Sequence, residues 1–209
     1  MLDGLRRAGW TPRAWAEFLT LAAGRSLVQA RLRPRALVEA TALHLAIAVL
    51  ADRRGRLWAA ASWAMTASHL GLLEERKGLG LPNLITLLRA NLPALDHTVG
   101  RVLPALALAS DLLDGKLARA TANETLFGKH ADFLADTAFW TWFTVRHEAS
   151  GRAQALTFLA WAAPVAILAA ASFSQGRLVE IPRSRWLRPS AAVEIVLGVR
   201  LLLRSFGRT

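Results

Sequence analysis

The most constraining feature of this chain is a long run without charge. Residues 153–176, AQALTFLAWAAPVAILAAASFSQG, contain no Asp, Glu, Lys or Arg. At 1.5 Å per residue, a helix of this length crosses a hydrocarbon layer of roughly 30 Å. Because lipid offers no hydrogen-bond partners to the backbone, we expect this segment to be a helix.

Further apolar blocks precede and follow this run. Hydrophobic residues make up 54% of the chain, whereas a soluble domain is usually nearer 45–50% apolar. The blocks fall at about 36–51, 57–73, 83–96, 100–118, 131–147, 153–173 and 190–204. The sequence therefore predicts an all-α, polytopic integral membrane bundle of about 6–7 transmembrane helices, several of them shorter than a full span.

The first 35 residues form a separate N-terminal segment. Thr11 and Pro12 are typical of a helix start, with Thr as N-cap and Pro at the first helical position. One face of this helix then carries Trp15, Phe18, Leu19 and Ala22. Two interpretations remain: an amphipathic helix lying on the membrane surface, or a helix packed on the protein itself. We expect residues 1–35 to be interfacial and residues 36–205 to form the membrane domain.

The charge balance and the cysteine count limit the function classes. The net charge is +11, mostly from arginines that flank the apolar blocks, as cytoplasmic loops beside anionic lipid do. Without an aromatic-interleaved basic patch, this charge does not indicate nucleic-acid binding. The chain has no cysteine, which excludes disulfides and thiolate metal sites.

Four of the seven aspartates lie close together in the chain, between residues 110 and 136. Asp111 and Asp114 project from one face of a helix, and Asp132 and Asp136 share a face of a second helix. A polar stretch separates the two, and Asn123 or Thr125 can cap the second helix. We expect two antiparallel helices whose carboxylate faces meet near a membrane surface.

Facing carboxylates repel one another in a low dielectric unless cations neutralise them. A set of oxygen ligands favours Mg²⁺, Mn²⁺ or Ca²⁺, and two such ions about 4 Å apart suit phosphoryl transfer. The small residues Gly115, Ala118 and Gly128 leave room on the same faces for a bulky ligand. Arg119 lies beside that face and can bind a phosphate through two hydrogen bonds.

Arg89 lies within an apolar block, where a charge is costly. Two interpretations are open: the guanidinium has a polar partner inside the protein, or it reaches out to the membrane interface.

The aspartate stretch fits the pattern D-x2-D-G-x2-A-R-x8-G-x3-D-x3-D at every fixed position. These positions are Asp111, Asp114, Gly115, Ala118, Arg119, Gly128, Asp132 and Asp136. The pattern resembles the signature of the CDP-alcohol phosphatidyltransferase family. The upstream segment LPNLITLLR is similar to the family's first core helix, through Pro82, Asn83, Thr86 and Arg89. The resemblance covers about residues 80–175.

The resemblance implies an integral membrane enzyme of phospholipid biosynthesis. An alcohol hydroxyl attacks the phosphorus of a CDP-linked lipid, expected to be CDP-diacylglycerol, and CMP leaves. Two Mg²⁺ or Mn²⁺ ions are implied as cofactors, a homodimer is plausible by analogy, and the site is expected on the cytoplasmic side. The high Arg-to-Lys ratio and the Ala/Leu bias indicate a bacterium with a GC-rich genome, so the membrane is expected to be a bacterial plasma membrane.

The family pattern also assigns roles to residues. Asp111, Asp114 and Asp132 are implied metal ligands, and Asp136 is implied both as a metal ligand and as the catalytic base. The remaining fixed positions are implied to line the nucleotide pocket: Gly115, Ala118, Arg119 and Gly128.

Two departures from the family pattern stand out. Asn83 and Asp111 are closer together than two full spans require, so we expect a short or distorted hairpin between them. Thr137 follows the last aspartate, where members that use phosphorylated acceptors often carry Lys or Arg. The acceptor alcohol is therefore left open.

Two other functions also use clustered carboxylates in a membrane. One is an intramembrane Mg²⁺-dependent prenyltransferase, although its acidic motifs lie in separate parts of the chain. The other is an ion transporter with a carboxylate site, which predicts ion flux without a nucleotide requirement.

Overall fold

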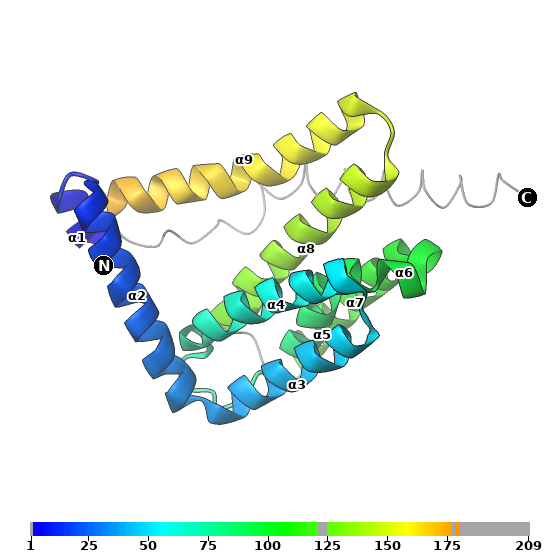
Figure 1. The fold of residues 1–209 in the computed structure, drawn as a ribbon, viewed down its shortest axis with the longest axis horizontal. Helices are drawn as coiled ribbons and strands as arrows, with labels where there is room; N and C mark the ends of the chain where they lie inside the picture. The colour runs from blue at the N-terminus through cyan, green and yellow to red at the C-terminus, as the bar shows by residue number, and fades with distance from the viewer. Residues whose placement is uncertain (1, 121–124, 177–178, 180–209) are drawn as a thin grey trace, which may run out of the picture. The chain divides into compact units, whose positions relative to one another are not determined.

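A computed structural model describes residues 2–120, 125–176 and 179, and in these residues it contains helices and no strand. The all-α prediction is thereby confirmed. The chain divides into two compact units, residues 26–143 and the described residues of 1–25 and 144–209. The helices are α1 (Leu2–Arg7), α2 (Pro12–Leu32), α3 (Pro34–Leu50), α4 (Arg53–Ser68), η1 (Leu70–Leu73), α5 (Gly80–Ala90), η2 (Leu92–Leu95), α6 (Asp96–Val99), η3 (Gly100–Val102), α7 (Leu103–Ala120), α8 (Leu126–His147) and α9 (Gly151–Gln175) (Figure 1).

The apolar blocks correspond to helices wherever the structure describes them. Among the described helices, α9 is the one both long enough and apolar enough to cross a membrane. A bundle of six or seven spans thus stays a prediction, and the block at 190–204 lies outside the described residues.

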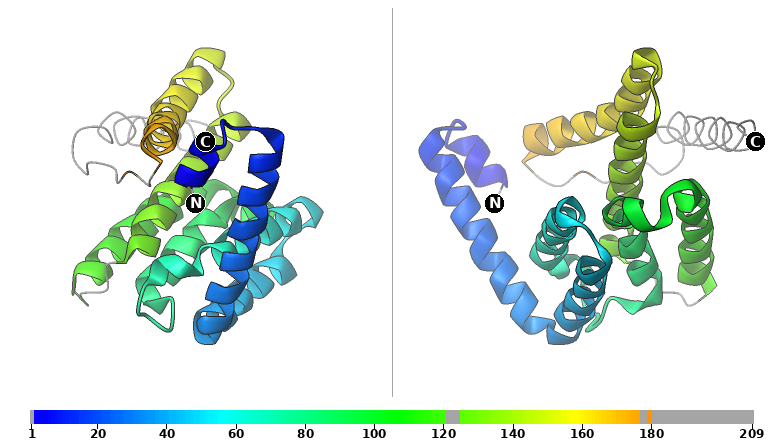
Figure 2. Two further views of the ribbon diagram at one scale, coloured as in Figure 1. Left: turned by 90° about the vertical axis from the view of Figure 1, so that its left-hand side faces the viewer. Right: turned by 45° about the vertical axis from the view of Figure 1, so that its right-hand side comes forward.

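In the larger unit, α3 and α4 form a hairpin and lie side by side in Figure 1 and in both views of Figure 2. Asp52 is the N-cap of α4, and its side chain accepts a hydrogen bond from the backbone N–H of Gly55 (2.7 Å). Buried apolar side chains of α3, η1, α5 and α8, together with the residue directly before α5, form a shared core. They are Ala36, Ala40, Leu70, Leu73, Leu79, Leu87 and Phe127.

The α3–α4 hairpin holds α5 at both ends. At the start of α5, Glu39 of α3 accepts a hydrogen bond from the backbone N–H of Leu79 (2.7 Å). At its end, Asn91 donates to Ser62 of α4 (2.9 Å) and lies 3.3 Å from Nε2 of the buried His44 of α3. His44 Nδ1 faces the Ala40 carbonyl oxygen at 2.7 Å and must donate to it, so Nε2 is the accepting nitrogen.

The expected short hairpin between Asn83 and Asp111 is confirmed. Helix α5 has 11 residues, or about 16 Å of length. Asn91 ends it and bonds back to the Leu87 carbonyl (2.8 Å), and Pro93 follows inside η2. Because a proline disfavours the α-helical conformation of the residue before it, here Leu92, helix α5 does not continue past Asn91. The chain then passes through η2, α6 and η3 before α7 begins.

The N-terminal helix start is also confirmed. Thr11 accepts a hydrogen bond from the Ala14 N–H (3.3 Å), and α2 begins at Pro12. In the smaller unit, Trp15 contacts Phe18 and also Phe173 of α9. Part of the aromatic face of α2 therefore packs on the protein itself, whereas Leu19 on the same face is exposed.

Gly55 tests the packing of α4 on η2. A Cβ added at Gly55 would collide with the Ala94 carbonyl oxygen and lie 2.9 Å from the Ala51 Cβ. We expect Gly55→Ala to lower the free energy of unfolding by about 1–3 kcal/mol, since overpacking forces the backbone apart. Thermal unfolding in detergent measures this change.

The matched control is Gly24→Ala in α2, where an added Cβ meets no atom within 4 Å. It should be neutral or stabilise by up to about 1 kcal/mol, because alanine favours the helix. Equal melting temperatures for the two variants would contradict the close contact at Gly55.

Candidate functional site

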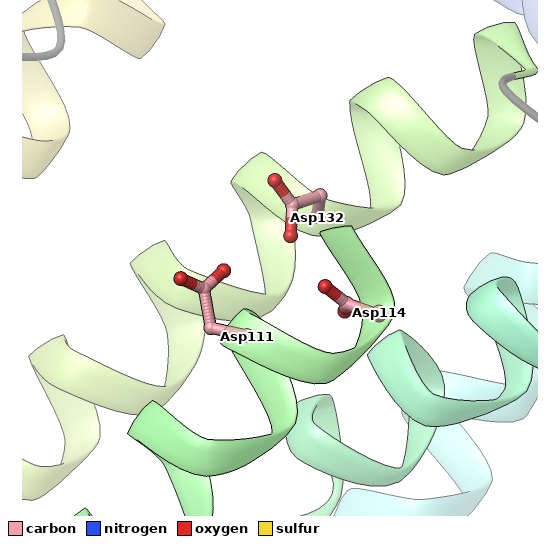
Figure 3. Close-up of side chains that lie close together, drawn as sticks. All are labelled: Asp111, Asp114 and Asp132. Atoms are coloured by element: carbon pink, nitrogen blue, oxygen red, sulfur yellow. The ribbon is translucent and has the colours of Figure 1, made fainter. Parts of the chain in front are cut away.

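Helices α7 and α8 bring three of the predicted aspartates together. Asp111 and Asp114 come from α7 and Asp132 from α8, and Figure 3 shows their carboxylates pointing toward one another. One carboxylate oxygen from each lies within 4.8 Å of the others. The expected meeting of two acidic helix faces is thus confirmed, although the segment 121–124 between the helices lies outside the described residues.

Arg89 of α5 lies at the centre of the acidic residues, and its side chain is 1% exposed. Its Nη1 is 3.0 Å from Asp114 Oδ2 and 3.2 Å from Asp111 Oδ1, and its Nη2 bonds to Asp132. Its Nε is 2.9 Å from Asp136 Oδ1, but at an angle that makes this contact an ion pair and not a hydrogen bond. Of the two interpretations left open by the sequence, the interior partner is correct.

The five residues are unequally accessible. The side chain of Asp114 is 6% exposed and that of Asp136 is 16%, whereas Asp111 and Asp132 are 41% and 47% exposed. Within this unit, Arg89 and Asp114 therefore form the floor of the cluster. Asp111 and Asp132 form its open side, where a ligand has access.

Two further polar residues lie on the same side of α5 as Arg89. Thr86 donates to Asp114 Oδ2 at 2.7 Å, and Asn83 donates to the Leu79 carbonyl at 2.7 Å. Both side chains are buried, as is Arg89. The sequence predicts them only as part of a segment similar to the family's first core helix. The signal that identifies them is polar residues at 83, 86 and 89 in an apolar block, a spacing that puts all three on one helix side.

The start of α8 is placed by Thr125 and Gly128. Thr125 accepts a hydrogen bond from the Gly128 N–H (2.9 Å) and caps α8, as expected; Asn123, the other candidate, lies outside the described residues. A Cβ added at Gly128 would lie 2.6 Å from Asn83 Oδ1. Glycine at this position therefore allows α8 to approach α5 closely.

The other predicted nucleotide-binding positions lie on α7. Gly115 directly follows Asp114 and is partly buried. Ala118 and Arg119 belong to α7 by their backbone, and their side chains are outside the described part of the chain. Substrate contacts for these residues and for Gly128 stay predictions.

The acidic cluster fits a divalent cation by its chemistry. All its ligand atoms are carboxylate oxygens, the donors preferred by Mg²⁺, Mn²⁺ and Ca²⁺. Asp111, Asp114 and Asp132 have the closest oxygens, and Asp136 joins them through Arg89.

An apolar cavity of about 330 Å³ lies elsewhere in the same unit. It is lined by side chains of α4, η1, α5 and α8, including Trp58, Leu72, Leu87 and Leu134. None of the four clustered aspartates lines it, so it is not the place for chemistry on phosphate.

Comparison with known proteins gives one family. The sequence model described as CDP-alcohol phosphatidyltransferase matches residues 79–208, which is more than half of the chain. The search of curated proteins and the search of solved structures find no match. The matched region begins just before α5 and contains all four clustered aspartates and Arg89.

Cation binding at the cluster has a measurable consequence for stability. Added Mn²⁺ should raise the melting temperature of the detergent-solubilised protein, because a ligand that binds only the folded state stabilises it. At about a hundredfold excess over the dissociation constant the gain is about 2.7 kcal/mol, or roughly 5–10 °C for a chain of this length. Asp132→Asn should remove most of this shift.

Asp3→Asn serves as the control, since Asp3 is an exposed carboxylate paired with Arg7 in α1. It should keep the full Mn²⁺ shift. A shift that is the same in the Asp132 variant as in the unchanged protein would place cation binding elsewhere.

Proposed function

Because the chain belongs to the CDP-alcohol phosphatidyltransferase family, we propose that it transfers the phosphatidyl group of CDP-diacylglycerol to an alcohol at the carboxylate cluster of α7 and α8. Members of the family are CDP-alcohol phosphotransferases, so the chain is an enzyme of this reaction class. The donor lipid, the acceptor and the roles of individual residues are the parts that are proposed.

One observation carries the proposal. Carboxylates from two helices converge, with oxygens of Asp111, Asp114 and Asp132 within 4.8 Å of one another and two of the three open to a ligand. Transfer of a phosphoryl group depends mainly on neutralising charge and aligning the reacting oxygens. A cluster of this kind supports such a reaction. The family match favours this reaction over the prenyltransferase and transporter alternatives.

The family uses a divalent metal, and in this proposal the metal is Mg²⁺ or Mn²⁺, with two ions. Asp111, Asp114, Asp132 and Asp136 would hold them. When bound, the ions neutralise charge on the diphosphate of the donor. The buried hydrogen bond from Thr86 orients one of these ligands, Asp114.

The proton of the acceptor is assigned to Asp136. As the acceptor oxygen attacks the phosphorus that bears the lipid, the bond from that phosphorus to the oxygen of CMP breaks and CMP leaves. Asp136 accepts the hydroxyl proton in the same step. The ion pair with Arg89 keeps the Asp136 carboxylate oriented toward the cluster.

The nucleotide is proposed to contact the small residues and the arginine of the family pattern. Gly115 and Ala118 give it space on α7, and Arg119 binds a phosphate through its paired N–H groups. Gly128 is proposed to line the same pocket at the start of α8, through its backbone, since Asn83 occupies the place of a side chain there. These four contacts rest on the family pattern and on the position of the residues in α7 and α8.

We further propose that the protein is embedded in the bacterial plasma membrane, with the cluster at the cytoplasmic surface. The family is generally membrane-bound, and α9 is long and apolar enough to span. Large apolar side chains also point outward from α3, α4 and α7, as expected where lipid covers a protein. They include Val38, Leu45, Val49, Leu57, Met65, Leu106, Leu112 and Leu113. A homodimer is proposed by family analogy alone.

The acceptor is tested directly. Purified protein is incubated with CDP-diacylglycerol and Mn²⁺, alcohols are added one at a time, and CMP release is followed by mass spectrometry. At the position after Asp136, the neutral Thr137 turns its hydroxyl to the Phe133 carbonyl (2.7 Å). This position thus offers no cationic side chain to a phosphorylated acceptor. We therefore expect CMP release to be fastest with an acceptor that lacks a phosphate group.

Asp136→Asn tests the base. We expect a folded protein whose turnover falls by about 10²–10⁴-fold, the usual contribution of a positioned proton acceptor. Glu17→Gln, which alters an exposed carboxylate in α2, should keep its CMP release. Near-normal turnover in the Asp136 variant would remove this residue from the proposed step.

A further inference from the structure

Arg89 is a fully buried cation in contact with four carboxylates from two other helices. Its Nη1 lies between Asp111 and Asp114, its Nη2 bonds to Asp132, and its Nε lies beside Asp136. Three nitrogens of one planar group thus reach all four acids. The resemblance at the sequence level assigned no role to this arginine.

A guanidinium buried to this degree must be paired, because it stays charged and its desolvation is costly. The pairing also constrains the acids, since each carboxylate must remain within reach of a rigid fork of N–H donors. A lysine at this position would offer a single ammonium, which cannot contact four carboxylates in the same way. The geometry at Arg89 is therefore specific to arginine.

The charges show what the arginine does for the cluster. Four ionised carboxylates and one guanidinium carry a net charge of −3. Two divalent cations would leave this site with one positive charge, facing the negative diphosphate of a donor. Without the arginine, the same two cations would leave no positive charge.

We propose that Arg89 is a positioning residue that serves as a permanent counter-charge of the carboxylate cluster. It holds the four acids in register when no cation is bound, and it weakens cation binding enough for the ions to exchange. The inference rests on the proposed function for the identity of the cations and the donor. Thr86 assists by holding Asp114, the most buried of the four acids, from the same side of α5.

Arg89→Met tests this role with a side chain of similar length and no charge. In EDTA its melting temperature should fall well below that of the unchanged protein, because four carboxylates repel one another without compensation. In Mn²⁺ most of this loss should be recovered, so the Mn²⁺-induced shift becomes larger than in the unchanged protein.

Calorimetric titration measures whether Arg89→Met binds Mn²⁺ more tightly or more weakly than the unchanged protein. The direction of this change separates the inference from a purely structural role. Loss of a positive charge beside the ligands should tighten Mn²⁺ binding by about tenfold or more. Simple disruption of the carboxylate geometry would weaken it. Arg89→Lys keeps the charge, so its Mn²⁺ affinity should stay close to that of the unchanged protein.

The matched control is Thr157→Val, at a buried polar residue of α9. Thr157 donates to the Ala153 carbonyl of its own helix (2.9 Å) and belongs to the smaller unit, whereas the aspartates belong to the larger. Its substitution should lower the melting temperature in EDTA and in Mn²⁺ by the same amount. Its Mn²⁺ affinity should stay unchanged.

The outcomes separate clearly. If Arg89→Met binds Mn²⁺ no more tightly than the unchanged protein, the counter-charge role is wrong. If that variant fails to fold even in Mn²⁺, the uncharged Arg89→Gln decides in its place: affinity above that of the unchanged protein supports the role, and equal or weaker affinity overturns it. If the affinities change as expected but no alcohol releases CMP from CDP-diacylglycerol, the proposed function fails while the role of Arg89 stands.

Discussion

The pairing of one buried arginine with four aspartates is the interaction on which the rest of the site depends. Arg89 cannot lose its charge, and its burial is tolerable only while carboxylates surround it. The same pairing keeps like charges on α7 and α8 close enough to share a ligand. Asp114 and Arg89 lie inside, and Asp111 and Asp132 face outward. The site thus has a rigid base and an accessible side.

The segment before the family match supports this arrangement. Residues 79–208 match the family, whereas α3 and α4 precede it and hold α5 at both ends. Glu39 bonds to the first turn, and the His44, Ser62 and Asn91 network holds the last. Because α5 carries Arg89 and Thr86, these contacts position the base of the acidic cluster from outside the family core.

Much of the local structure could be predicted from the sequence. The helix caps at Thr11 and Thr125 were expected from residue type, and the short hairpin after α5 from the spacing of Asn83 and Asp111. The meeting of Asp111, Asp114 and Asp132 followed from the 100° helical step. Packing at Gly128 could not be predicted, since its close neighbour Asn83 lies on another helix.

The sequence by itself determined which segments are helical and which side chains share a helix face, because helix periodicity and capping act within a few residues. Only the tertiary structure decided the partners of Arg89. Two of them, Asp114 and Asp132, are 25 and 43 residues away along the chain. From sequence, interior pairing and a position at the lipid interface were equally compatible with an arginine in an apolar block. Packing of α5 against α7 and α8 removes water from the guanidinium, and that desolvation makes the carboxylates its necessary partners.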